Sequence, residues 1–68
     1  MMRISYNKLW KMLIDKEMKK SDLKEKAGIS SASLAKLGKG DNITTDVLLR
    51  ICEVMYCRIE YILETIRE

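Results

Sequence analysis

The chain has 68 residues, of which 47% are hydrophobic and 34% charged, and it contains no histidine. This length accommodates one domain, since a single hydrophobic core usually occupies about 50 to 200 residues. The apolar fraction is too high for a disordered chain. Without histidine there is no imidazole base and no mixed cysteine and histidine zinc site, and the glycines form no phosphate-binding fingerprint. We therefore expect no enzyme, no metal and no cofactor.

The two cysteines, Cys52 and Cys57, lie in an apolar run at a spacing that places their side chains on different faces of a helix, away from disulfide geometry. We interpret both as small core residues, which fits a reducing, intracellular setting. No apolar run approaches the roughly 20 residues that span a bilayer, and residues 1–6 lack the apolar stretch of a signal peptide. The sequence therefore predicts a cytoplasmic protein with no membrane segment.

Charge is distributed unevenly along the chain. Residues 1–40 carry ten Lys or Arg against four acidic residues, whereas residues 41–68 carry three against six. A basic first part with an acidic second part is the electrostatic footprint of a nucleic-acid-binding domain that approaches its polyanion from one side. Lysines that only solvate helices would give the same composition, so charge alone does not decide the function.

The first predicted element is a helix over residues 5–17, where apolar residues recur at helical spacing. Ser5 is expected to cap its amino end, and Ile4 to pack against Leu9 as a hydrophobic staple. We interpret Trp10, the single tryptophan, as a core residue of this helix.

Two short helices are predicted in the centre of the chain, around residues 21–27 and 31–37, joined by Gly28, Ile29 and Ser30. Neither is long enough to be stable alone. Gly28 can end the first helix in a left-handed conformation at no steric cost, and the hydroxyl of Ser30 can cap the second. The apolar residues placed to hold the two helices at a near-right angle are Leu23, Ala27, Ile29, Leu34 and Leu37.

Two further helices are predicted after the third glycine. One spans residues 44–55, with Thr44 as its cap and a second hydrophobic staple formed by Ile43 and Leu48. The last is a short amphipathic helix, on which apolar residues recur at positions i, i+3, i+4 and i+7. Its apolar residues are Ile59, Ile62, Leu63 and Ile66.

The run SDLKEKAGISSASLAKLGKG, from Ser21 to Gly40, resembles the helix-turn-helix of phage-repressor-like (Cro/CI-type, XRE) transcriptional regulators, with the motif at about residues 20–39. The resemblance covers about residues 5–65. It implies that residues 1–68 form one all-α domain, a compact five-helix lambda-repressor-like DNA-binding fold. It also implies double-stranded operator DNA as the ligand, a dimer as the common state, and insertion of residues 31–37 into the major groove. Within the family, the chain is most similar to very small stand-alone regulators of Gram-positive bacteria.

Three positions depart from the family's pattern. Lys20 stands where many members have a Gln that touches the DNA backbone and supports a recognition-helix residue, so a phosphate contact is retained but the polar relay is lost. Lys24 replaces a small Ala, and its long stem can point outward. Arg58 stands where relatives cap the last helix with Asp or Ser, which puts the start of that helix in doubt.

The second helix of the motif is expected to read bases, since Leu34 and Leu37 fix its inward side. Lys36 can address guanine, Ala32 can meet a thymine methyl, and the serine hydroxyls accept either kind of base. Each serine is equally well explained as a capping or solvated hydroxyl. The residues expected to face the groove are Ser30, Ser31, Ala32, Ser33 and Lys36.

Phosphate contacts are expected on both sides of that helix. Lys19, Lys20 and Ser21 stand at the start of the motif, where backbone amides and the positive helix end also favour an anion. Lys39 and Asn42 follow the second helix. Such contacts position the protein on the duplex and do not select its sequence.

A homodimer is expected, because a two-fold pair reading half-sites about 34 Å apart multiplies the discrimination of one helix. If Ile59 and Leu63 point into the core, then Tyr61, Ile62 and Ile66 form an apolar edge on which a second copy can pack. In the alternative interpretation, Ile62 and Ile66 complete the core of the monomer.

A second function remains open from the sequence. The chain could be a protein-interaction module, such as an antitoxin or a regulator-binding partner, with DNA binding secondary. In that case the other protein would be contacted by exposed aromatic and aliphatic side chains, which dominate such interfaces. The candidates are Tyr56, Tyr61, Ile62 and Ile66. No small-molecule substrate is evident in either interpretation.

Overall fold

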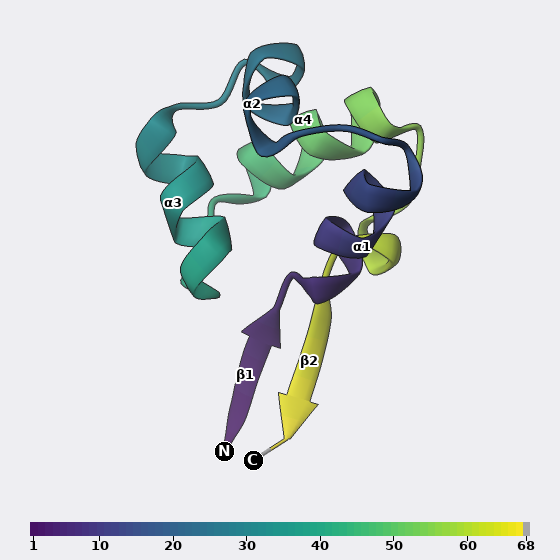
Figure 1. Ribbon diagram of the computed structural model, residues 1–68. Coiled ribbons are helices and arrows are strands. Elements are labelled where there is room, and N and C mark those ends of the chain that lie inside the picture. The colour runs from purple at the N-terminus through teal and green to yellow at the C-terminus, as the bar shows by residue number, and fades with distance from the viewer. Residues whose placement is uncertain (68) are drawn as a thin grey trace.

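The computed structural model describes residues 1–67, in which it places four α-helices and one two-stranded sheet. The helices gather into one body, and the two strands project from it and carry both chain termini at their far end (Figure 1). Within the described residues, no helix has both the length and the apolar character needed to cross a bilayer. In chain order the elements are β1 (Met2–Ser5), α1 (Asn7–Asp15), α2 (Lys20–Ala27), α3 (Ser31–Lys39), α4 (Thr45–Met55), the 3-10 turn η1 (Ile59–Tyr61) and β2 (Glu64–Arg67).

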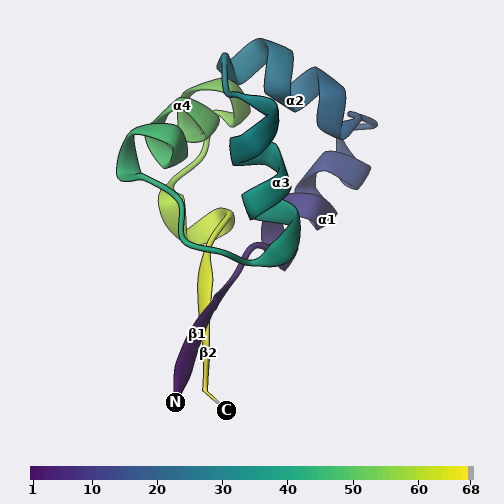
Figure 2. The same ribbon diagram turned by 90° about the vertical axis from the view of Figure 1, so that its left-hand side faces the viewer.

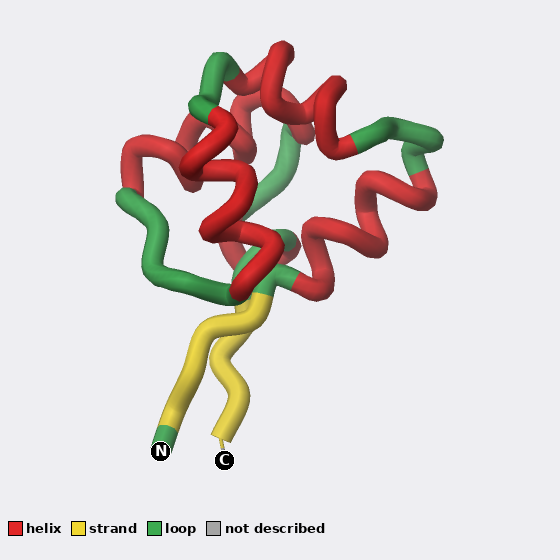
Figure 3. The backbone as a smooth tube through the Cα atoms, turned by 60° about the vertical axis from the view of Figure 1, so that its left-hand side comes forward, coloured by secondary structure: helices red, strands yellow, loops and turns green. Residues whose placement is uncertain are grey.

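The predicted fifth helix is wrong, and the fold is therefore mostly helical and not all-α. Residues 59–61 form only the turn η1, whose N-cap, Arg58, makes no side-chain capping bond. The following residues form β2, which pairs antiparallel with β1 so that Met2 lies opposite Arg67. The backbone groups of this segment are satisfied by a strand from the other end of the chain (Figure 3), and local helical spacing could not indicate this partner.

The predicted start of the first helix is also wrong. Ser5 ends β1 and is buried, and its Oγ accepts a hydrogen bond from the backbone N–H of Asn7 at 3.3 Å. Tyr6 is the N-cap of α1 and makes no side-chain capping bond. Helix α1 ends at Asp15, two residues before the predicted end, because Glu17 adopts a left-handed φ of 55°. The residues predicted at the two ends of this helix instead connect α1 to β1 on one side and to α2 on the other.

The core receives side chains from every helix and from the segment that leads into β2. Ile62 is 0% exposed, so it completes the core of the single chain and cannot form the predicted apolar edge. Ile59, predicted to point inward, is 40% exposed, because a 3-10 turn and a strand place these side chains differently from a helix. The buried apolar residues are Tyr6, Leu9, Leu13, Leu23, Ala27, Ile29, Leu37, Leu48, Ile51, Met55 and Ile62.

The cysteines lie closer together than helical spacing predicts. Helix α4 ends at Met55, and Tyr56 adopts a left-handed φ of 53° that turns the chain back, so that the N–H of Cys57 donates to the carbonyl oxygen of Cys52 at 3.2 Å. Both are half-buried free thiols. Burial, together with the neighbouring Cys57 thiol, raises the pKa of Cys52, so this sulfur is held in its neutral form.

Candidate nucleic-acid interface

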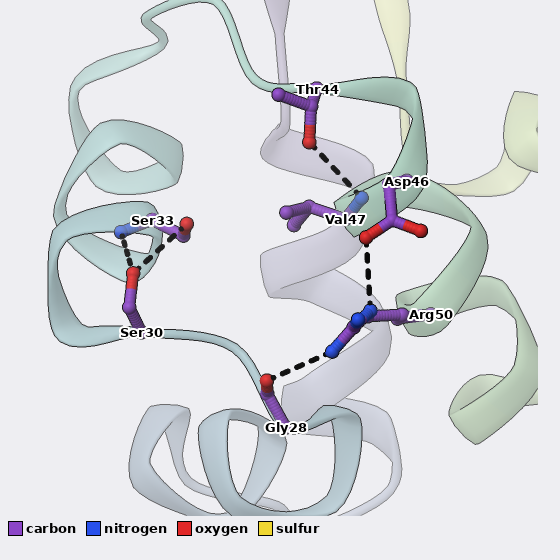
Figure 4. A network of polar contacts seen from close by, with 7 residues as sticks. All are labelled: Gly28, Ser30, Ser33, Thr44, Asp46, Val47 and Arg50. Carbon is purple, nitrogen blue, oxygen red and sulfur yellow. Dashed lines mark hydrogen bonds and ion pairs between the residues drawn. The ribbon is translucent and has the colours of Figure 1, made fainter.

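The turn between α2 and α3 has the predicted construction. Gly28 is the C-cap of α2 with φ 65° and ψ 35°, a left-handed conformation that glycine adopts without strain. Ser30 is the N-cap of α3, and its Oγ accepts a hydrogen bond from the N–H of Ser33 at 3.1 Å. Ile29 between them is buried. The turn therefore holds α3 at a fixed orientation on α2 (Figure 4).

Sequence reasoning missed a residue that stabilises this turn. Arg50 of α4 donates from a guanidinium nitrogen, Nη1, to the carbonyl oxygen of Gly28 at 3.3 Å, and its Nε lies 3.1 Å from the carboxylate of Asp46 (Figure 4). The carbonyl of a helix C-cap has no partner within its own helix, so Arg50 satisfies it from outside. Arg50 lies 22 positions after Gly28 in the sequence, so local residue spacing could not indicate this contact.

One side of α3 is open to solvent, and it contains most of the predicted groove-facing residues. Leu37 is 1% exposed and anchors the opposite side to the core. Leu34 was predicted to lie inward but is only half-buried and stands at the flank of the helix. The residues of α3 exposed on the open side are Ser31, Ala32, Ala35, Lys36, Gly38 and Lys39, of which Ala35 and Gly38 were not predicted.

Two of the predicted base-reading serines have hydroxyls already engaged. The Oγ of Ser30 accepts from the backbone of Ser33 and donates to the Oγ of Ser33 at 3.1 Å (Figure 4). The capping interpretation is therefore confirmed for Ser30. Lys36 is exposed on the open side of α3 and is the long polar side chain at the middle of the helix.

The start of α2 lies beside α3 and presents cations there. Lys19 is the N-cap of α2, and its backbone N–H donates to the Asp22 carboxylate at 3.0 Å, so its side chain is not needed for capping. The Nζ of Lys20 lies 4.5 Å from the centroid of the Trp10 ring, which is half-buried against the core. A cation over an aromatic face is attracted by the ring quadrupole. This contact orients the Lys20 side chain.

The loop after α3 is held by a long-range hydrogen bond. The hydroxyl of Tyr6 donates to the carbonyl oxygen of Asp41 at 2.9 Å. Burial, and secondarily the charge of Asp41, raise the pKa of Tyr6, so this donor stays protonated. Lys39 and Asn42, on either side of Asp41, are exposed. The loop is thus fixed where both polar side chains can reach an external partner.

The segments that carry the predicted site residues meet on one face of the molecule, although Ser33 is half-buried and lies outside the open side of α3. In Figure 2, α3 faces the viewer, the start of α2 lies to its right, and the loop from α3 to α4 lies at its lower left. The start of α2 and the loop after α3 therefore flank α3 on opposite sides. An exposed helix between two polar segments fits DNA: the helix can enter the major groove while the two segments contact the phosphate backbones on either side of it.

A small pocket lies beside this face, and a wider groove lies away from it. A small polar pocket of about 190 Å³ is formed by β1, the first turns of α1 and the end of α3. A wider apolar groove of about 1000 Å³ is formed by α1, α4 and the segment that follows α4, and no residue of α2 or α3 lines it. Tyr56 and Tyr61 line the groove and are exposed.

The sequence model of the Cro/C1-type HTH DNA-binding domain family matches residues 8–68. Among solved structures, the chain is similar to one described as the crystal structure of transcriptional regulator VanUg, form II. The TM-score is 0.94 and the sequence identity 52%, over 98% of this chain and 89% of that chain. No curated protein matches the sequence.

Proposed function

The chain belongs to the Cro/C1-type helix-turn-helix DNA-binding domain family, and on that premise we propose that it is a sequence-specific transcriptional regulator whose helix α3 enters the major groove of operator DNA. The observation that carries this proposal is the open side of α3, flanked by the lysines at the start of α2 and by the loop that Tyr6 fixes. A regulator with a similar structure supports it.

The proposed roles follow from chemistry and exposure. Lys36 addresses a guanine edge, Ala32 and Ala35 contact thymine methyl groups, and Ser31 offers a hydroxyl with little base preference. The Ser30 hydroxyl caps α3, which leaves it a minor role toward DNA, and Ser33 shares that hydrogen bond. Phosphate contacts are proposed for Lys19, Lys20, Ser21, Lys39 and Asn42.

The experiment that tests this function is a salt titration of binding to a random-sequence duplex. Each phosphate neutralised contributes about 0.9 to the slope of log affinity against log salt. Lys20→Ala should reduce that slope by about 0.9 and weaken binding to all sequences about equally. Lys16→Ala is the matched control, because Lys16 lines the apolar groove away from the motif and the charge change is the same. Affinity that does not change with salt would contradict the proposal.

We further propose that two copies bind each operator, since the few base-reading groups of one α3 distinguish few base pairs. The surface for this pairing cannot include Ile62, which is buried, so Tyr61 and the half-buried Ile66 are what remains of the predicted edge. Sedimentation of the protein alone and with a palindromic duplex tests this: a mass of two chains per duplex is expected. One chain per duplex at saturation would contradict it.

One observation favours the competing function, a module that binds another protein. The apolar groove exposes Leu49, Tyr56 and Tyr61, three large side chains of the kind that dominate protein interfaces. The same salt titration separates the two functions. Absence of binding to any duplex at low salt would favour the interaction module.

A further inference from the structure

The turn at the end of α4 brings the two cysteines of the chain together. The N–H of Cys57 donates to the carbonyl oxygen of Cys52 at 3.2 Å, and Tyr56 between them has a left-handed φ of 53°. This is the 6→1 hydrogen bond of a Schellman helix end, in which the side chains at the two ends of the bond commonly pack against each other. In this chain those two side chains are both thiols.

The two thiols interact directly. Burial raises the pKa of Cys52, and the charge of Cys57 and a hydrogen bond with the Cys57 side chain raise it further. A hydrogen bond between two thiols requires neighbouring sulfur atoms. Two cysteines whose side chains already meet can be bridged by rotation about their side-chain torsions, without movement of the backbone. The turn therefore prepares Cys52 and Cys57 for a disulfide, although both are free thiols in the structure.

Both thiols can be reached from outside the molecule. Cys52 and Cys57 are half-buried, and together they line the apolar groove of about 1000 Å³. A concavity of this volume is large enough to admit a small organic molecule. A reagent that reacts with thiols and enters the groove therefore meets a pair of sulfur atoms and not a single one.

We propose that Cys52 and Cys57 form a redox-active dithiol that exchanges with small-molecule disulfides. The sulfur of Cys57 attacks one sulfur of the small disulfide, whose S–S bond breaks and releases a first small thiol. The sulfur of Cys52 then attacks that of Cys57, which forms the internal disulfide and releases a second small thiol. The protein gives up two electrons and two protons, and the two released thiols carry them away.

The order of the two attacks follows from the neutral state of Cys52. A thiolate is the attacking species, so the sulfur whose pKa is raised by its neighbour attacks second. Once Cys57 is part of the mixed disulfide, it no longer carries the charge that disfavours the Cys52 thiolate. The inference is independent of the proposed DNA binding, because α2 and α3 contribute no residue to the groove.

The test equilibrates the full chain with mixtures of reduced and oxidised glutathione and counts free thiols by alkylation and mass spectrometry. The ratio of internal disulfide to dithiol should be at least about tenfold higher in the folded protein than in the same chain unfolded in urea, because the turn holds the two thiols in contact. A tenfold preference corresponds to about 1.4 kcal/mol, so the disulfide form should melt about 6 to 11 °C above the reduced form. An excess of reduced glutathione should restore both thiols.

A matched control moves one thiol by one position. Tyr56→Cys combined with Cys57→Ala keeps two cysteines, but the second then stands where the side chain is 94% exposed. Its ratio of internal disulfide to dithiol should be about tenfold lower than that of the wild type, with its fold checked by circular dichroism. The comparison of folded and unfolded wild type needs no variant.

Three results would overturn the proposal. The first is an equal ratio of disulfide to dithiol in the folded and the unfolded wild type. The second is a folded control variant that matches the wild type. The third is a wild type that accumulates mixed disulfides with glutathione in place of the internal bond.

Discussion

Leu37 and Leu34, on the same helix, provide a matched pair that tests how α3 is attached to the core. Leu37 is 1% exposed, whereas Leu34 is half-buried at the flank. Leu37→Ala removes three buried carbon atoms, about 2.4 kcal/mol of transfer free energy, and leaves a cavity that adds about 1 to 2 kcal/mol. Leu34→Ala removes the same atoms from a site that solvent partly fills, so about 1 kcal/mol is expected.

These costs are large for so small a domain. A chain of this length is stable by about 3 to 10 kcal/mol, so Leu37→Ala should unfold a substantial fraction of the protein at 37 °C while Leu34→Ala stays folded. Urea denaturation followed by far-ultraviolet circular dichroism measures both differences at similar m-values. An equal or larger cost for Leu34→Ala would refute the reasoning that Leu37 alone anchors this helix.

Three further predictions follow from single residues. Gly28→Val should destabilise the protein by at least about 1 to 2 kcal/mol in the same denaturation assay, because a β-branched residue is strained at φ 65°; unchanged stability would show that the turn relaxes. Tyr6→Phe should cost about 0.5 to 1.5 kcal/mol near neutral pH, since it removes the hydrogen bond to Asp41. Folding raises the pKa of Tyr6 above its ordinary value of 10.0, so the stabilising contribution is present below pH 10 and is lost as pH rises through the folded value. The difference between wild type and Tyr6→Phe should therefore shrink as the pH rises above 10, and a constant difference would contradict this. Ile62→Glu should unfold the monomer, whereas Ile66→Glu should stay folded by circular dichroism, and the reverse order would contradict the core placement of Ile62.

Local chemistry was sufficient to predict the centre of the fold. Gly28, Ser30 and Thr44 each control a helix end through their own conformation or hydroxyl, and all three are caps in the structure; the Thr44 Oγ1, for example, accepts from the N–H of Val47 at 3.3 Å. Such contacts span a few residues, so sequence spacing specifies them. The open side of α3 was likewise predictable, except that Leu34 is only half-buried at its flank and that the exposed Ala35 was not predicted.

The termini were not predictable for the opposite reason. Ile59, Ile62 and Ile66 fit helical spacing, yet Ile66 lies opposite Arg3 in a sheet that joins the two ends of the chain. That pairing is a long-range contact, and a short segment whose pattern fits either structure is decided by its partner. The missing cap at Arg58 was the local signal that pointed away from a helix. The polar pocket was unpredictable in the same way, because it needs β1 beside the end of α3.

The central claim, that α3 reads operator DNA, is tested most directly by selecting bound sequences from a random duplex pool with the wild type and with Lys36→Ala. The wild type should enrich an inverted repeat with half-site centres about 10 base pairs apart, and Lys36→Ala should enrich the same repeat with preference relaxed at one base pair of each half-site. A pool that stays random with the wild type, or a Lys36→Ala pool identical to that of the wild type, would contradict the account.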